Sequence, residues 1–198
     1  MWNTLISIFP YAIAYTIPML MTSLGGLYSE RSGVTNLGLE GLMLVGYFAS
    51  AITIKMTEAT LGVQALPLGL LVGVAAGAVF SILHAFASIN LKADQVISGT
   101  AINMLATALT VYLARTISGS GNVRILMGIV RKNIPVLSQI PIIGPLFFSQ
   151  SYWTTWLCLV IWALSWILLY KTSFGLRLRA CGEHPSAVAS AGVNVHRM

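Results

Sequence analysis

Five long stretches of this sequence carry almost no charge, and they limit what the chain can fold into. These stretches are residues 2–29, 33–54, 59–91, 95–114 and 134–170. With histidine taken as neutral, Glu40 is the only charged residue within them. An α-helix needs about 20 mostly apolar residues to cross a bilayer, and a backbone surrounded by lipid must satisfy its own hydrogen bonds. The sequence therefore predicts an all-α integral membrane protein.

The last stretch is too long for one span, and its first part contains helix breakers. Pro135, Pro141, Gly144 and Pro145 precede a run without proline or glycine, so we expect the last helix to begin near residue 152. The predicted spans are residues 4–27, 34–54, 66–90, 95–115 and 152–170. Together they predict a polytopic helix bundle with about five spans.

Composition excludes the soluble alternatives. Hydrophobic residues make up 57% of the chain and charged residues 8%, whereas a soluble domain carries about 25% charged residues. A disordered chain needs the opposite balance. The net charge of +6 is more typical of cytoplasmic loops beside anionic lipid than of nucleic-acid binding. We therefore expect membrane lipid, and no nucleic acid, among the partners.

An odd number of spans places the two termini on opposite sides of the membrane. Lys and Arg divide six to one side and five to the other, which does not decide the orientation. The polar, basic segment after Tyr170 is the better guide, and we place it in the cytoplasm. This assignment predicts an outside N-terminus, an extracytoplasmic loop at 116–151 and a cytoplasmic segment at 171–198.

Small residues recur at every fourth position of the third span, which places them on one helical face. A smooth face of this kind lets another helix approach closely, and close packing is how helices associate within lipid. The stripe consists of Ala65, Gly69, Gly73, Gly77, Ser81 and Ala85. We expect tight helix packing along it.

Three polar residues at membrane depth require a partner or water. An ionised Glu40 would cost at least about 2.5–3.5 kcal/mol at the bilayer centre. Asn36 precedes Glu40 by four residues, so both are expected on one helical face, and Asn103 lies in the fourth span. Either these side chains cap a broken helix and bond neighbouring backbone, or they line a solute path. The residues alone leave both interpretations open.

None of the common catalytic motifs occurs in the sequence. There is no GxxxxGKS/T phosphate loop, no HExxH, no GxSxG and no Cys/His zinc spacing. Cys158 and Cys181 are expected to be free thiols. We therefore predict a chain that is not an enzyme and holds neither a metal nor a cofactor, so that any ATP used in its function binds another polypeptide.

The segment after Tyr170 carries a helix signal of its own. Pro185 suits the first position of a helix, and Gly192 is placed to end it. A helix this short is not stable alone. It needs a partner surface, either the membrane face of the bundle or another subunit.

Three motifs, in this order, resemble bacterial ABC-importer permeases of the ribose and branched-chain amino acid type. Residues 29–41, Ser-Glu-Arg-Ser-Gly-Val-Thr-Asn-Leu-Gly-Leu-Glu-Gly, match the Glu-Arg-x-Gly-x-x-Asn-x-x-x-Glu-Gly pattern of the nucleoside and simple-sugar branch. Residues 92–103, Lys-Ala-Asp-Gln-Val-Ile-Ser-Gly-Thr-Ala-Ile-Asn, are the second match. Residues 174–195 resemble the coupling loop of these permeases, although His184 replaces the usual asparagine and Val188 a common alanine.

This resemblance implies a permease subunit in a bacterial inner membrane that forms a path for nucleosides or related sugars with a second permease subunit. An extracytoplasmic substrate-binding protein would deliver the solute, and cytoplasmic ATPase subunits would bind ATP. Carried over by position, Asn36, Glu40 and Asn103 are the candidate pathway residues. The candidate ATPase-coupling residues are Gly182, Glu183, His184, Pro185, Ala187 and Gly192.

Permeases of this type usually have further spans after the coupling loop, so we expect the chain to be truncated at its C-terminus. Two other classes of function stay open at this point. One is a secondary carrier driven by an ion gradient through Glu40. The other is a membrane scaffold or fragment without transport of its own.

Overall fold

The computed structural model of the chain describes residues 1–135 and 137–195. Its long helices are α1 (Trp2–Arg31), α2 (Leu39–Leu61), α3 (Ala65–Ala85), α4 (Gln95–Ser118) and α5 (Trp153–Lys171). The shorter ones are η1 (Gly62–Gln64), η2 (Phe86–Asn90), η3 (Leu137–Gln139), η4 (Gly144–Phe148), α6 (Ser173–Glu183) and α7 (Pro185–Ser190). Within the described ranges, the only β-type pairing is an isolated antiparallel bridge between Lys132 and Ser151.

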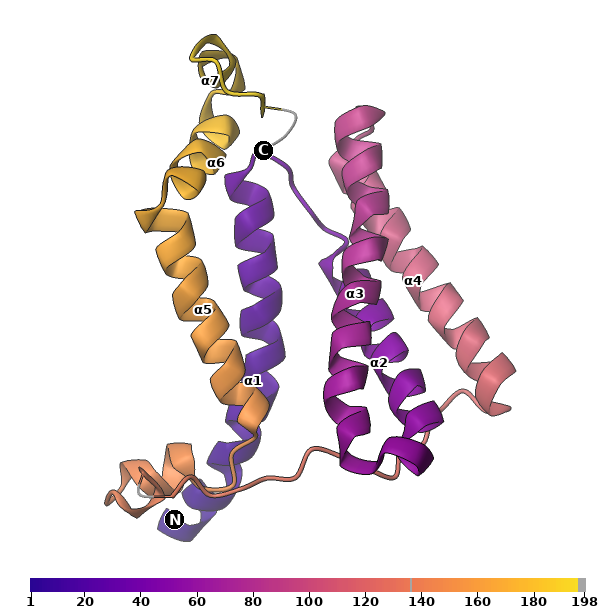
Figure 1. The fold of residues 1–198 in the computed structure, drawn as a ribbon, viewed down its shortest axis with the longest axis vertical. Coiled ribbons are helices and arrows are strands. Elements are labelled where there is room, and N and C mark those ends of the chain that lie inside the picture. Colours follow the sequence, from indigo (N-terminus) through magenta and orange to yellow (C-terminus); the bar gives the residue numbers. More distant parts are fainter. Residues whose placement is uncertain (136, 196–198) are drawn as a thin grey trace.

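Four helical runs in the described part are long and apolar enough to cross a membrane. They are Thr4–Arg31, Leu39–Asn90, Gln95–Ser118 and Trp153–Lys171. The second run has 52 residues and turns back at Gly62, whose positive φ of 55° suits glycine. It therefore forms the two helices α2 and α3, and Figure 1 shows five long helices of alternating direction. The predicted all-α, polytopic fold is confirmed.

Glycines bring α2 and α3 into backbone contact. A Cβ built on Gly73 would lie 2.7 Å from the carbonyl oxygen of Gly46 and 3.0 Å from the Cβ of Ser50. A Cβ on Gly69 would collide with the side chain of Ile54. The glycines of the predicted stripe in the third span, Gly69, Gly73 and Gly77, therefore lie on the packing face of this antiparallel pair, whereas Ala85 at the end of the stripe is exposed.

The start of α2 differs from the prediction. The second span was expected from residue 34, but α2 begins at Leu39; residues 34–36 have no regular structure, and residues 37–38 form a turn. Asn36 therefore lies outside the helix, and the expectation that Asn36 and Glu40 share one helical face is wrong. The reason is local competition, because side chains from α1, α3 and α4 bond the backbone of this segment in place of a helical turn.

The long helices form two groups, α1 with α5 and α2 with α3 and α4 (Figure 1). Within the first group, the Tyr28 hydroxyl donates to the backbone oxygen of Ser165 at 3.1 Å. The loop between α4 and α5 runs past the ends of both groups. At one point the Glu58 carboxylate accepts from the backbone nitrogens of Leu126 and Met127, at 2.9 and 3.1 Å. This loop therefore ties the end of α2 to the beginning of α5.

Candidate functional site

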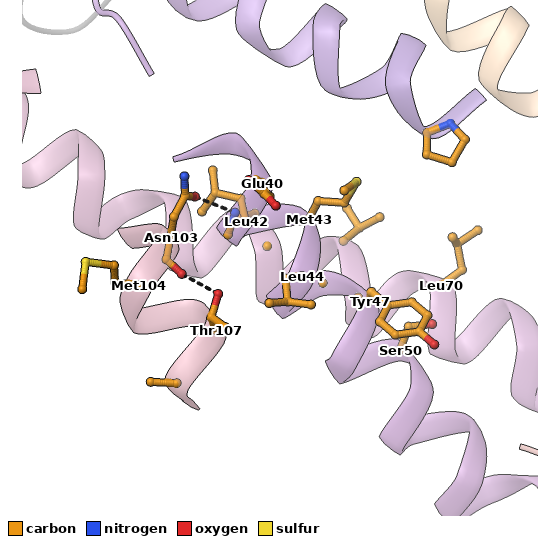
Figure 2. A pocket seen from close by; sticks show the side chains of 18 residues that line it. Glu40, Leu42, Met43, Leu44, Tyr47, Ser50, Leu70, Asn103, Met104 and Thr107 are labelled. Carbon is orange, nitrogen blue, oxygen red and sulfur yellow. Dashed lines mark hydrogen bonds between the residues drawn. The ribbon is translucent and has the colours of Figure 1, made fainter. Parts of the chain in front are cut away.

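Helices α2, α3 and α4 line an open pocket of about 1110 Å³. Its walls come from α2, α3 and α4 (Figure 2), and Pro18 of α1 also lines it. Gly41, Gly46, Gly73 and Gly77 are among the lining residues. A Cβ on Gly41 would lie 2.9 Å from the Cα of Asn103, and one on Gly46 would lie 3.0 Å from the backbone oxygen of Gly73. These glycines therefore allow the helices that form the pocket walls to approach each other closely.

Glu40 supplies the one carboxylate that lines this pocket. It lies in the first turn of α2, where the positive end of the helix dipole favours a carboxylate. Its side chain is exposed and forms no hydrogen bond or ion pair with any described residue. Tyr47 and Ser50 of α2 and Thr107 of α4 add hydroxyl groups to the lining (Figure 2). The pocket is thus mostly apolar, with a few hydrogen-bonding groups and one carboxylate.

Asn103 of α4 uses its amide to hold the start of α2. Its Oδ1 accepts from the backbone nitrogen of Gly41 at 2.7 Å, and its Nδ2 donates to the backbone oxygen of Leu37 at 2.9 Å (Figure 2 shows the first bond). Gly41 permits this approach, since a Cβ there would lie 2.9 Å from the Cα of Asn103. The amide therefore replaces two hydrogen bonds that the broken helix cannot form itself.

Asn36 also acts on local backbone. Its Oδ1 accepts from the backbone nitrogen of Gly38 at 2.9 Å, just before α2 begins, and it is absent from the pocket lining. Of the three predicted pathway residues, the structure brings Glu40 and Asn103 together at the pocket and leaves Asn36 beside it. The geometry of both asparagines matches the capping interpretation, whereas the Glu40 carboxylate has no such role.

The sequence did not identify two residues that hold the segment 34–38 in place. The Oε1 of Gln95 accepts from the backbone nitrogen of Thr35 at 2.6 Å, and the Nε2 of His84 lies 3.3 Å from the backbone oxygen of Thr35. His84 is only 3% exposed, and its Nδ1 lies 3.0 Å from the Ser98 hydroxyl. Since a carbonyl oxygen only accepts, Nε2 is the donor of this pair. The only sequence signal for this contact was that His84 lies in an uncharged stretch, and the sequence did not indicate that Thr35 is its partner.

The segment after α5 contains a second helix that the sequence did not predict. The Thr172 hydroxyl caps α6 by accepting from the backbone nitrogen of Gly175 at 3.2 Å. Leu178 and Cys181 are each 5% exposed, so α6 has a buried face, and the helix packs against α5 and α1. The hydrophobic pattern of α6 covers only about three turns and is interrupted by arginines. It was therefore too weak to predict a helix from the sequence alone.

The predicted coupling residues lie at the far end of this segment, in two distinct settings. Gly182 is half-buried against the turn that follows α1, where a Cβ on Gly182 would collide with the backbone oxygen of Arg31. The other five are exposed, namely Glu183, His184, Pro185, Ala187 and Gly192. The short helix expected from the sequence is confirmed as α7, with proline in its first position and a glycine of φ 81° beyond its end.

The family of the chain follows from comparison with known proteins. The family described as branched-chain amino acid transport system / permease component matches residues 8–198. The chain therefore belongs to this permease family and is a multi-pass membrane protein. No solved structure matches it.

Two relatives are similar over nearly the whole chain. The guanosine ABC transporter permease protein NupQ of Bacillus subtilis (strain 168) is 45% identical over 96% of this chain. The nucleoside ABC transporter permease protein NupC of Lactococcus lactis subsp. cremoris (strain MG1363) is 43% identical over 98% of this chain. A putative glucose ABC transporter permease protein of Haloferax volcanii is 36% identical over 90%. The chain spans 60% and 61% of the length of the first two relatives.

Proposed function

We propose that this chain forms part of the solute path in an ABC importer for nucleosides. The observation that carries the proposal is the identity of 45% and 43% to two permeases whose names state guanosine and nucleoside transport. The two alignments cover 96% and 98% of this chain. The solute would cross the membrane between this subunit and a second permease subunit, after delivery by an extracytoplasmic binding protein.

The pocket beside Glu40 is our candidate for a point on this path. Its volume of about 1110 Å³ is sufficient for a nucleoside, since pockets for small molecules typically measure about 300–1,000 Å³. Its apolar surface suits a base, and the Glu40 carboxylate would accept hydrogen bonds from the N–H or O–H groups of the solute. Asn36 and Asn103 would contribute by shaping the start of α2.

The exposed surface formed by the end of α6 and by α7 is our candidate for the ATPase contact. Glu183, His184, Pro185 and Ala187 are exposed there, on the side of the bundle opposite to the N-terminus (Figure 1). We propose that this side is cytoplasmic and that ATP binds only to the partner ATPase. The chain would then need no cofactor of its own.

Reconstituted uptake tests this function. The full-length protein is placed in proteoliposomes with its second permease subunit, its ATPase subunits and its binding protein. We expect uptake of labelled guanosine only when ATP is supplied to the ATPase side, and we expect competition by other nucleosides but not by leucine. Uptake driven by a sodium or proton gradient without ATP would instead support a secondary carrier. Absence of any uptake would contradict a transport role.

The orientation is tested by thiol labelling in cells. Cys181 is a poor reporter because it is 5% exposed, whereas Ser190 is exposed on α7. In a Cys158→Ala background, we expect Ser190→Cys to react with a membrane-impermeant maleimide only after the inner membrane is permeabilised. The matched variant Ser120→Cys, exposed in the loop after α4, should react without permeabilisation. The reverse pattern would overturn the proposed orientation and the ATPase contact with it.

A further inference from the structure

We propose that one face of α2 binds the two halves of a nucleoside separately, with Tyr47 stacking on the base and Glu40 accepting hydrogen bonds from the two ribose hydroxyls. This inference rests on the proposed function, because it takes nucleosides as the solute. It deepens that function by naming one specificity-determining residue for the base and one for the sugar.

The face consists of residues three or four positions apart in α2, so their side chains project in nearly the same direction. They are Glu40, Met43, Tyr47 and Ser50, and all four line the pocket (Figure 2). Tyr47 follows Glu40 by seven residues, which places the two about 10 Å apart along the helix axis. A nucleoside carries its base and its sugar at opposite ends, so these two side chains can contact different halves of one molecule.

Tyr47 presents a free aromatic ring to the pocket. It is 68% exposed, and its hydroxyl forms no hydrogen bond with any residue that the structure describes. The residue lies about two turns into α2, deeper than the membrane surface where tyrosine hydroxyls usually meet headgroups and water. In lipid this hydroxyl would lack a partner, which is costly, so we infer that it faces a solute path. Stacking on tyrosine suits every base, because each base has a π face.

Ser50 adds a free hydroxyl one turn beyond Tyr47. The hydroxyl of Thr53 donates to the backbone oxygen of Ala49 at 2.8 Å, as is common for threonine within a helix. The Ser50 hydroxyl has no such partner in the described part of the chain. It is therefore available to donate to, or accept from, the polar edge of a base.

Met43 supplies the apolar surface between Tyr47 and Glu40. It is 49% exposed, and its sulfur accepts from the Thr22 hydroxyl of α1 at 3.6 Å. An unbranched thioether side chain adapts readily to a neighbouring molecule, so Met43 can pack beneath the bond that joins base and ribose.

Glu40 provides the contact for the sugar. A carboxylate only accepts hydrogen bonds, and the 2′ and 3′ hydroxyls of ribose are two adjacent O–H donors. Acidic side chains bind the ribose of dinucleotides by the same pairing. The Asn103 amide bonds both Leu37 and Gly41, so the backbone that carries Glu40 is fixed to α4. This preorganisation lowers the cost of binding.

The test measures binding of guanosine and of 2′,3′-dideoxyguanosine, which lacks both hydroxyls. The full-length transporter is assembled in nanodiscs without its binding protein, so that only sites on the path are measured. We expect the unmodified transporter to bind guanosine at least about 10-fold more tightly than the dideoxy compound. Glu40→Gln should weaken binding of guanosine at least about 10-fold and change that of the dideoxy compound by less than about twofold.

Tyr47→Leu should weaken binding of both solutes by about 5- to 150-fold, because leucine is apolar but cannot stack. Tyr47→Phe keeps the ring and should bind both within about threefold of the unmodified transporter. The matched control is Tyr112→Leu, which removes a tyrosine of 67% exposure on α4 outside the pocket lining and should change neither affinity. If Tyr47→Leu fails to assemble, Tyr47→Met is measured in its place.

Several outcomes would overturn the inference. If Glu40→Gln weakened both solutes equally, the carboxylate would contact the base and not the ribose. Unchanged binding in Tyr47→Leu, or an equal loss in Tyr47→Phe, would exclude stacking. If the unmodified transporter took up guanosine with ATP but bound none without its binding protein, this face would not be a binding site, although the proposed function would stand. Failure of ATP-driven uptake itself would contradict the proposed function, so the two failures are distinguishable.

Discussion

Substitution of Asn103 by leucine is expected to lower the free energy of unfolding by about 1–3 kcal/mol. Leucine has nearly the same size but can neither accept from the Gly41 nitrogen nor donate to the Leu37 oxygen. Gly41 is buried, so its unsatisfied backbone nitrogen carries this cost, whereas Leu37 is exposed and its oxygen adds little. Equilibrium unfolding of the protein in lipid bicelles measures the difference.

Thr107→Val is the matched control for this prediction, because Thr107 lies one turn further along the same face of α4. Its hydroxyl donates to the backbone oxygen of Asn103 at 2.8 Å, but that oxygen belongs to a helical turn. We therefore expect Thr107→Val to change the free energy of unfolding by less than about 1 kcal/mol. Equal effects of the two substitutions would show that Asn103 acts through packing alone and would contradict its role at the start of α2.

Glu40→Gln is expected to reduce nucleoside uptake by at least about 10-fold at low solute concentration while leaving the fold intact. The carboxylate lines the pocket without a partner among the described residues, so its removal breaks no contact within the chain. A hydrogen bond to a charged acceptor is worth about 1.5–3 kcal/mol, and each 1.4 kcal/mol corresponds to a tenfold change in affinity. Uptake by the reconstituted transporter measures the loss of transport, and a thermal melt of the variant shows whether the fold is intact.

Glu30→Gln provides the control for charge removal. Glu30 is exposed near the end of α1 and is absent from the pocket lining, so we expect its neutralisation to leave uptake within about twofold. If Glu40→Gln transported nucleosides as well as Glu30→Gln does, the pocket beside α2 would not be a contact point of the solute.

Local sequence signals predicted those elements whose ends are determined by neighbouring residues. The fourth span was expected from residue 95, and α4 begins there, where the Asp94 carboxylate accepts from the backbone nitrogens of Val96 and Ile97 at 2.9 and 3.0 Å. The start of α7 was likewise expected at Pro185, and the helix begins there. In both places the deciding interaction joins residues within one turn of a helix, so it is visible in the sequence.

The sequence by itself determined that this chain crosses a membrane as a set of helices, because the thickness of the bilayer and the absence of water within it allow few other structures for long uncharged stretches. Only the tertiary structure decided where α2 begins, because Thr35 is bonded by residues 49 and 60 positions away in the sequence. The same holds for α6, which packs against α5 and α1. These contacts depend on which helices become neighbours, and hydropathy carries no information on that choice. They also decided that Asn103 supports the backbone while Glu40 remains free to face the pocket.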